Sequence, residues 1–383
     1  MANFKNYSFF SALQYKGIDQ NDTGFHVVVA RVVYDMKIEK NNQCALTLSS
    51  KQESLNYSDI NYKDMSRSSV KYESDLAPYK PKTDIIINAT AYSPHDQATP
   101  SFNVSVMIGN YKKSLRIHGP RSWLFTPLGW SLGFPKPIKQ LDITYEYASG
   151  GWYESEDKTI ASPNNPLGMG WYPAEYLKTC KVTELPAPQI ESETLPVVSI
   201  KELILPEGFG FFGRGWHGRI EYAGTYDNAW VENRHPYLPE DFNFRYWCGA
   251  HPTLQISHPK PCDNIPVELF GLLPASEIAD QHIRIQIPVE TLFIFFNTEF
   301  RLGITKDMIL DTIIIDMNAR KVFCSYRITL AEELNVTEIQ LRYIAVDHRQ
   351  KQIDRATAMR QDLSSTEFIP LPPSLLNKGN LYG

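Results

Sequence analysis

The sequence has 383 residues, of which 43% are hydrophobic and 21% charged, and its formal net charge at pH 7 is −5. This composition is typical of a globular chain that can bury a sizeable core, and the length allows two or three domains. The charge balance lacks the basic excess of nucleic-acid-binding proteins, so we expect no nucleic-acid partner.

Neither a leader nor a membrane span is expected. The first residues, MANFKNYSFFSALQYKG, hold no continuous apolar core of the secretory kind. The most apolar run, TLFIFF at 291–296, is far shorter than the ~20 residues that cross a bilayer. The cysteines are few, scattered and odd in number, which favours reduced thiols in a cytoplasm over a disulfide framework: Cys44, Cys180, Cys248, Cys262 and Cys324.

Strand patterns dominate the first half of the chain. β-Branched and aromatic residues predict strands at 25–34, 84–92, 102–108, 113–118 and 140–147. The segment FNVSVMIGNYKKSLRIHG alternates apolar and polar residues on both sides of Gly109-Asn110, and this pattern predicts a hairpin.

Residues 181–197 carry three prolines and three glutamates, which predict a linker or an extended crossover. We therefore expect an N-terminal β unit over 1–180, a C-terminal β unit over 198–347, and a tail over 348–383. Strands are predicted in the second unit at 200–205, 219–224, 267–273, 282–287, 291–297 and 338–346. A further hairpin is expected with arms at 312–315 and 322–327 and its turn at 316–320.

Helix patterns are short, at 227–233, 330–334 and 351–361. The predicted fold class is therefore mostly β, with β-sandwich-like units packed together, long ordered loops and few short helices.

The segment Gly224–Trp247, GTYDNAWVENRHPYLPEDFNFRYW, is long, aromatic and irregular. Its prolines remove backbone donors and fix φ, so it must run as turns and extended pieces. Ordered irregular loops often carry function. The residues chosen as partner-binding or framework candidates are Tyr226, Asp227, Trp230, Arg234, Tyr237, Leu238, Pro239, Asp241, Phe242 and Arg245. Of these, we expect Asp227 and Asp241 to bind backbone N–H groups or arginine rather than a partner.

Residues 208–213, GFGFFG, match the spacing of a dinucleotide-binding loop. That loop needs a helix to open at its glycines, whereas here more glycines and a strand-like segment follow. A glycine-rich turn is the favoured interpretation, and no cofactor is expected.

Cys248, His251, His258 and Cys262 are residue types that bind zinc, and the first step of the spacing suits chelation. No second pair reinforces them, so loop side chains and buried thiols are favoured over a metal site, although zinc stays an alternative.

Catalysis is not expected. The chain lacks the G-x-S-x-G motif of a serine nucleophile. The clustered carboxylates Asp227, Glu232, Glu240 and Asp241 lie near arginines in the sequence. Such carboxylates form ion pairs with depressed pKa values, which do not suit general-acid work.

Five segments occur in an order that resembles a bacterial family catalogued as domain of unknown function 2169: 76–94, 109–123, 165–171, 223–247 and 311–327. The resemblance spans roughly 10–345. It implies a cytoplasmic, non-enzymatic adaptor or chaperone of a type VI secretion system, which binds an effector toxin, a spike protein or both. Where the family pattern resembles N-A-A-P-x-D-Q, this chain has CGAHPTLQ at 248–255, which weakens the zinc alternative.

Two other function classes stay open. The aromatic loops would also suit a carbohydrate-binding or carbohydrate-processing β protein, and the chain could be a structural component of the secretion apparatus. The segment Gly224–Trp247 is either a brace between the β units or a surface for a partner, and the brace is slightly favoured.

Overall fold

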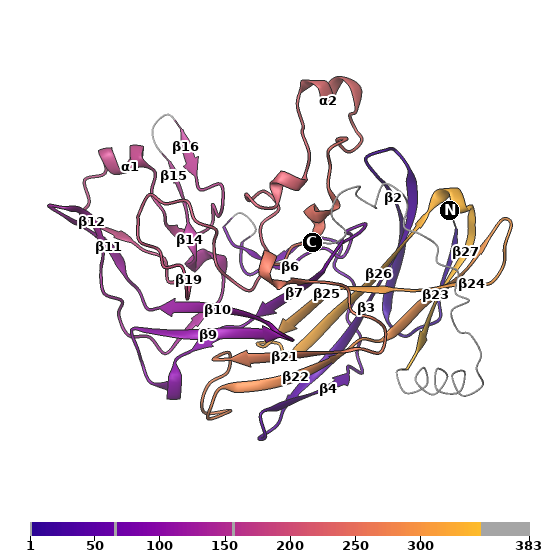
Figure 1. Ribbon diagram of the computed structural model, residues 1–383, viewed down its shortest axis with the longest axis horizontal. Coiled ribbons are helices and arrows are strands. Elements are labelled where there is room, and N and C mark those ends of the chain that lie inside the picture. Colours follow the sequence, from indigo (N-terminus) through magenta and orange to yellow (C-terminus); the bar gives the residue numbers. More distant parts are fainter. Residues whose placement is uncertain (1, 65–66, 155–157, 346–383) are drawn as a thin grey trace.

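A computed structural model describes residues 2–64, 67–154 and 158–345 (Figure 1). The described chain is mostly strand, and its two α-helices are short: α1 (Ala174–Thr179) and α2 (Asn228–Asn233). The predicted mostly-β class, with long loops and few short helices, is confirmed. No helix in these ranges combines the length and apolar character needed to cross a membrane.

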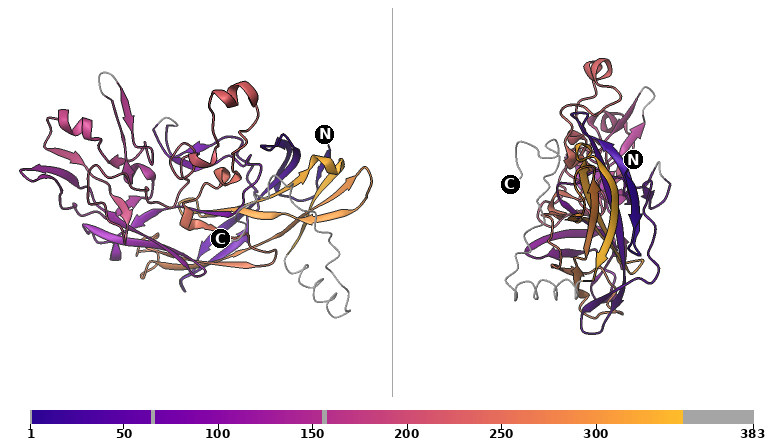
Figure 2. Two further views of the ribbon diagram at one scale, coloured as in Figure 1. Left: turned by 45° about the horizontal axis from the view of Figure 1, so that its top comes forward. Right: turned by 90° about the vertical axis from the view of Figure 1, so that its right-hand side faces the viewer.

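One large sheet of twelve strands forms the body of the molecule, and it curls along its length (Figure 2). In spatial order the strands are β19 (Ile190–Ser192), β10 (Tyr111–His118), β9 (Ser101–Ile108), β21 (Asn264–Phe270), β22 (His282–Pro288), β4 (Gln43–Leu48), β3 (Gly24–Ile38), β26 (Lys321–Ala331), β25 (Ile309–Asp316), β7 (Thr83–Asn88) and β20 (Gln255–Ile256). The twelfth strand, β2 (Ser11–Ile18), pairs with the first half of β3.

The centre of this sheet is the antiparallel pair β3 and β26, in register from Lys321 opposite Asp35 to Ala331 opposite Phe25. Both strands are rich in valine, isoleucine and aromatic residues and are buried over most of their length, as expected of strands covered on both faces. Beside them, β25 runs parallel to β7, whose residues are all buried.

Smaller sheets surround the main one. A four-stranded sheet consists of β1 (Asn3–Asn6), β27 (Val336–Ile344), β23 (Thr291–Thr298) and β24 (Ile304–Asp307). A three-stranded sheet consists of β12 (Gly129–Leu132), β11 (Ser122–Thr126) and β18 (Glu184–Pro186). The two-stranded pairs are β13 (Gln140–Asp142) with β8 (Thr90–Tyr92), β14 (Ser149–Gly150) with β17 (Met169–Gly170), β15 (Trp152–Glu154) with β16 (Thr159–Ala161), and β5 (Ile60–Asn61) with β6 (Val70–Tyr72).

Both predicted hairpins are confirmed. Strands β9 and β10 turn at Gly109-Asn110, where Gly109 has a φ of 55°. Strands β25 and β26 turn through the predicted residues 316–320, and Arg320 takes the positive φ there. The predicted strands at 25–34, 282–287 and 291–297 correspond to β3, β22 and β23.

The strands predicted at 200–205, 219–224 and 140–147 were wrong in whole or in part. Residues 200–205 form no strand, and 219–224 hold the 3₁₀ turn η3 (Ile220–Tyr222), because Arg219 turns inward to a buried carboxylate. The prediction at 140–147 holds only for β13, since the chain then forms η2 (Tyr145–Tyr147) and inserts the ring of Tyr145 against Phe212 and Trp216.

The predicted helix at 330–334 is the end of β26 followed by the 3₁₀ turn η6 (Glu332–Leu334). The remaining 3₁₀ turns are η1 (Pro94–Asp96), η4 (Phe244–Trp247) and η5 (Pro252–Leu254). The predicted helix at 351–361 lies outside the described residues.

The predicted linker at 181–197 contains β18 and β19, and β19 belongs to the main sheet. Strands from before and after this segment alternate in that sheet, because β9 pairs with β21 and β3 pairs with β26. The hydrogen bonding thus crosses the predicted boundary, and the division into domains stays a prediction.

Candidate functional site

The segment Gly224–Trp247, hereafter the aromatic lobe, projects from the main sheet close to β2 (Figure 1). It contains the predicted short helix α2, whose N-terminus is capped by Asp227 accepting a hydrogen bond from the backbone N–H of Trp230 at 2.9 Å. Asp241 accepts bonds from the backbone N–H and the hydroxyl of Thr225, at 2.9 and 2.7 Å. Both carboxylates therefore organise the backbone of the lobe, the role that the sequence suggested for them.

The base of the lobe is buried. Phe242 and Phe244 pack edge to face at 5.3 Å and join Tyr79 and two residues of β3, Phe25 and Val27, in a separate apolar cluster. Burying a side chain of this size stabilises a fold by about 1.5–3 kcal/mol. The base therefore anchors the lobe to the long central strand of the sheet.

The tip of the lobe is exposed. Tyr226, Val231 and Tyr237 expose 54%, 58% and 46% of their surface. Trp230 supports them from within, because its indole N–H donates to the carbonyl of Tyr237 at 2.9 Å and its ring meets that of Tyr226 at 4.7 Å. The tip thus presents apolar rings on an ordered backbone.

Arg234 joins the lobe to the turn between β2 and β3. Its guanidinium contacts both carboxylate oxygens of Asp22 at 2.9 and 3.1 Å and donates to the carbonyl of Gln20 at 2.8 Å. The same group donates to the carbonyl of Leu238 at 2.9 Å. A bidentate arginine fixes orientation as well as position, so the lobe and this turn are held together.

The structure therefore gathers all ten candidate residues in one lobe but divides them between two environments. Phe242 and Pro239 are buried in the base, and Arg245 is exposed with its guanidinium 4.8 Å from the ring centre of Tyr222. The base is packed against β3, and the tip is exposed.

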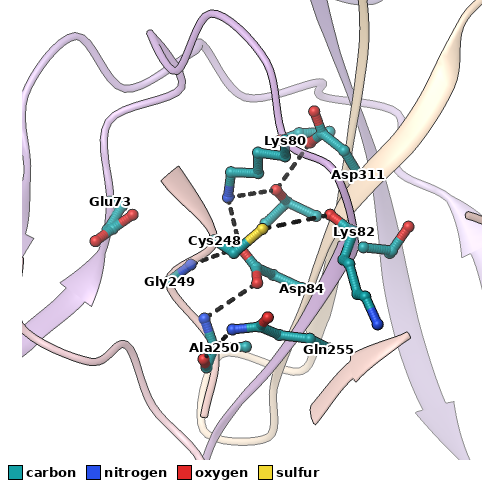
Figure 3. A network of polar contacts seen from close by, with 12 residues as sticks. Glu73, Lys80, Lys82, Asp84, Cys248, Gly249, Ala250, Gln255 and Asp311 are labelled. Atoms are coloured by element: carbon teal, nitrogen blue, oxygen red, sulfur yellow. Dashed lines mark hydrogen bonds and ion pairs between the residues drawn. The ribbon is translucent and has the colours of Figure 1, made fainter. Parts of the chain in front are cut away.

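A network of buried charges contacts the segment that follows the lobe (Figure 3). Asp84 is fully buried and accepts bonds from the ammonium group of Lys80 at 2.7 Å and from the backbone N–H groups of Gly249 and Ala250 at 2.8 and 3.1 Å. Burial disfavours the charge on Lys80, but the facing Asp84 and the nearby Asp311 outweigh burial and raise the lysine pKa. This pair ties the start of β7 to the segment that follows the lobe.

A second buried pair links the lobe to a distant part of the chain. Arg219 contacts the carboxylate of Glu73 at 2.5 and 3.1 Å, and it donates to the carbonyls of Phe212 at 2.6 Å and Tyr246 at 2.7 Å. Burial opposes the charge on Glu73, yet Arg219 and Arg214 lower its pKa overall. The guanidinium is thus a hub for three segments.

A third cluster sits between the central strands. Arg31 of β3 pairs with Asp75, which also accepts a bond from the hydroxyl of Ser325 at 2.9 Å. Arg327 of β26 pairs with Asp311 and donates to the carbonyl of Asp75 at 2.8 Å. Sequence reasoning missed this cluster, although an arginine inside each of two mostly apolar strands could have indicated it.

The four residues considered for zinc do not converge. Cys248 lies near the carbonyl of Lys82, His258 contacts the hydroxyl of Thr83 at 3.0 Å, and Cys262 contacts that of Thr291 at 3.6 Å. His251 contacts Lys113 and Thr253. Throughout the described residues, no group of three or more His, Cys, Asp or Glu side chains could hold a metal ion.

The glycines of 208–213 allow close packing against aromatic rings. A Cβ on Gly208 would lie 2.7 Å from the Tyr145 ring, and one on Gly213 would lie 2.4 Å from the Trp216 ring. No helix begins at these glycines. The segment is a glycine-rich turn, as the sequence favoured.

One titratable cluster was not predicted. Lys113 of β10 pairs with Glu207 and donates to Nδ1 of His251 at 3.2 Å. The same nitrogen accepts a bond from the backbone N–H of Thr253 at 3.3 Å and thereby caps η5. Burial, reinforced by the charge of Lys113, lowers the pKa of His251 to about 3. Glu207 also lies 3.8 Å from Nε2 of His251.

This histidine predicts acid sensitivity. In the unfolded chain it takes up a proton near its ordinary pKa of 6.5, whereas the folded protein resists that proton down to about 3. Stability is therefore retained above pH 6.5 and falls as the pH drops from 6.5 toward 3. Between pH 7 and pH 5, the free energy of unfolding should fall by about 2 kcal/mol more in the wild type than in His251→Asn. The reason is that one pKa unit corresponds to about 1.4 kcal/mol.

Urea unfolding at both pH values measures this difference. Asparagine keeps an acceptor at the capping position and does not titrate. The His251→Asn variant therefore removes the proton uptake while it preserves the cap. Equal losses in the two proteins would contradict the assignment of the proton uptake to His251.

A second surface was also missed. The hairpin of β11 and β12 exposes Phe125 to 57% and Leu128 completely, and Phe134 just beyond it is equally exposed. Exposed apolar groups gathered in one place commonly mark contact sites. This apolar hairpin lies at the opposite end of the molecule from β27 (Figure 1).

Comparison with protein families gives a match. The model of a family described as "Uncharacterized protein conserved in bacteria (DUF2169)" matches residues 22–327. No curated protein and no solved structure matches the chain.

Proposed function

The chain belongs to the bacterial family of domain of unknown function 2169, and from that premise we propose that it is a non-enzymatic, cytoplasmic adaptor of a type VI secretion system. In this role it binds an effector toxin and helps to load it onto the spike. The resemblance described above is the source of this role. The exposed tip of the aromatic lobe on its buried base is the observation that supports it.

The tip has the properties of a protein-binding surface. Tyrosine, tryptophan and arginine dominate the energetics of interfaces, because large rings bury much area with few rotatable bonds. Trp230 and Arg234 hold the tip in place through the carbonyl of Tyr237 and the carboxylate of Asp22. An ordered surface loses little conformational entropy on association, so more of its contact energy remains as affinity.

The non-enzymatic part of the proposal has separate support. Asp227 and Asp241, which the sequence offered as acid–base candidates, accept bonds from the backbone of the lobe. The buried carboxylates Asp84 and Glu73 face Lys80 and Arg219. Groups engaged in this way stabilise a fold and are poorly placed to exchange protons with a substrate.

Tyr237→Ala should weaken binding of the effector by about 2 kcal/mol, roughly thirty-fold in Kd, if this ring is an interface anchor. The melting temperature should stay nearly unchanged, because the side chain is 46% exposed and only its backbone carbonyl holds Trp230. Calorimetric titration with candidate effector and spike proteins would measure both affinities.

Tyr111→Ala is the matched control, because Tyr111 is 70% exposed on the β9–β10 hairpin and does not belong to the lobe. If the two substitutions weakened effector binding equally, the lobe would not be part of the interface. Failure of the wild-type chain to bind any effector or spike component would count against the adaptor role itself.

The alternatives have their own tests. Binding on a glycan array or turnover in a hydrolase screen would favour a carbohydrate-directed protein. Co-fractionation with assembled sheath or baseplate, rather than with free effector, would favour a structural component.

A further inference from the structure

Strand β2 is an unusually long open edge. It has eight residues and pairs only with β3. Every other strand at the end of a sheet in the described chain has four residues or fewer. Proteins usually keep their edge strands short, because an open row of backbone groups invites pairing with another chain. An edge of this length is therefore a feature that needs an explanation.

The hydrogen-bonding pattern shows which groups of β2 are open. Just beyond the end of the β2–β3 ladder, the backbone N–H of Asp19 donates to the carbonyl of Thr23 at 3.1 Å. Hydrogen-bonded pairs alternate along an antiparallel ladder, so every second residue of β2, counted back from Asp19, bonds to β3. The intervening residues of β2 direct their N–H and C=O groups away from β3. No described residue forms a backbone hydrogen bond with this outer row, which consists of Ala12, Gln14, Lys16 and Ile18.

The side chains of β2 hold this edge in place. The hydroxyl of Tyr15 donates to the carbonyl of Ala77 at 2.7 Å, and the amide of Gln14 contacts Nδ1 of His26 at 3.1 Å. Lys16 pairs with Glu332 across the sheet, so its side chain does not guard the edge in the way that a free lysine would. The outer row is thus fixed in strand geometry before any partner arrives.

The surroundings of the edge are apolar and electrically neutral. Phe9, just before β2, is 58% exposed, and Ile18 at its end is 47% exposed. Two cations beside the edge are each matched by an acid, Lys16 by Glu332 and Arg234 by Asp22. A strand that fits here carries apolar side chains and little net charge.

We propose that the outer edge of β2 binds an extended segment of the effector as an added β-strand. This inference rests on the proposed adaptor function and specifies how the partner is held. Alternating donors and acceptors along one line are matched best by another extended backbone, which is the basis of strand addition. The lobe, clamped by Arg234 to the turn that ends β2, lies at the end of the same edge.

Lys16→Pro tests the backbone contact directly. Proline at an outward-facing position of an edge strand removes one open N–H and places its ring in the path of a docking strand, while the ladder to β3 stays intact. Lys16→Ala is the matched control, because it loses the same Glu332 pair but keeps the N–H. With effector as the probe, Lys16→Pro should bind at least ten-fold more weakly than Lys16→Ala.

Hydrogen exchange on the wild-type chain gives a second measurement that needs no variant. The amides of the outer row should exchange freely in the free protein and become at least ten-fold slower in the effector complex. The neighbouring amides of Leu13, Tyr15 and Gly17, which face β3, should be protected in both states. This alternation is specific to an added strand, because a partner that merely covered the region would slow both sets alike.

The outcomes separate the two proposals. Binding with equal affinity by both variants, without protection of the outer row, would overturn the strand addition while the adaptor role stands. Absence of effector binding by all three proteins would overturn both. Dimers of the wild-type chain that Lys16→Pro abolishes, seen by light scattering without effector, would show that a second copy occupies the edge and would overturn the inference.

Discussion

Replacement of Asp84 by asparagine should lower the free energy of unfolding by about 3–5 kcal/mol, the range found when one partner of a buried ion pair is removed. The fully buried carboxylate serves three donors, the ammonium of Lys80 and the N–H groups of Gly249 and Ala250. Asparagine has almost the same shape but carries no charge. The variant would leave Lys80 buried without its nearest counter-charge.

Urea denaturation of wild type and variant measures this loss. Asp35→Asn is the matched control, because the side chain of Asp35 on β3 is 49% exposed and lies 4.0 Å from Lys321. Exposed ion pairs contribute about 0–1 kcal/mol, so the control should change little. A change below about 1 kcal/mol for Asp84→Asn would mean that water reaches Lys80 and that the pair is not a structural centre.

Replacement of Arg219 by alanine should cost a similar 3–5 kcal/mol, because it leaves Glu73 buried and takes a donor from two carbonyls. One of those carbonyls belongs to Tyr246 in the base of the aromatic lobe. Hydrogen exchange in the lobe should therefore rise together with the loss of global stability. Both are measured on the same protein, by urea denaturation and by mass-resolved exchange.

Arg245→Ala is the control within the lobe. Its guanidinium is exposed and lies 4.8 Å from the ring centre of Tyr222, an interaction worth about 0.5–1 kcal/mol. Comparable destabilisation by the two arginine substitutions would contradict the view that the buried pair, rather than arginine content in general, braces the lobe.

Local features could be read from the sequence because they depend on neighbours along the chain. The alternation of apolar and polar residues around Gly109-Asn110 specifies a hairpin independently of the rest of the chain. The short helix capped by Asp227 also depends only on neighbouring residues. The strand predicted at 219–224 was wrong because Arg219 pairs with a residue that is distant in the sequence. This partner is the carboxylate of Glu73, which lies 146 residues earlier, and no local sequence pattern predicts the pair.

The candidate site shows the same limit. Sequence reasoning found the aromatic lobe and left open whether it was brace or surface. The packing of the lobe depends on β3, since Phe25 and Val27 bury the base while Tyr226 and Tyr237 keep 54% and 46% of their surface exposed. The open edge of β2 was not predicted, because the strand's own residues do not show which of its sides has a partner.

The pairing of β3 with β26 also sets an order of events during synthesis. Phe25 and Ala331 are opposite each other, 331 − 25 = 306 positions apart. At about 5–20 residues per second, a ribosome needs roughly 15–60 s to deliver the second strand after the first. During this interval the valine-rich β3 lacks its longest neighbour. A product stopped before β26 would therefore leave one side of this buried strand without its pairing partner.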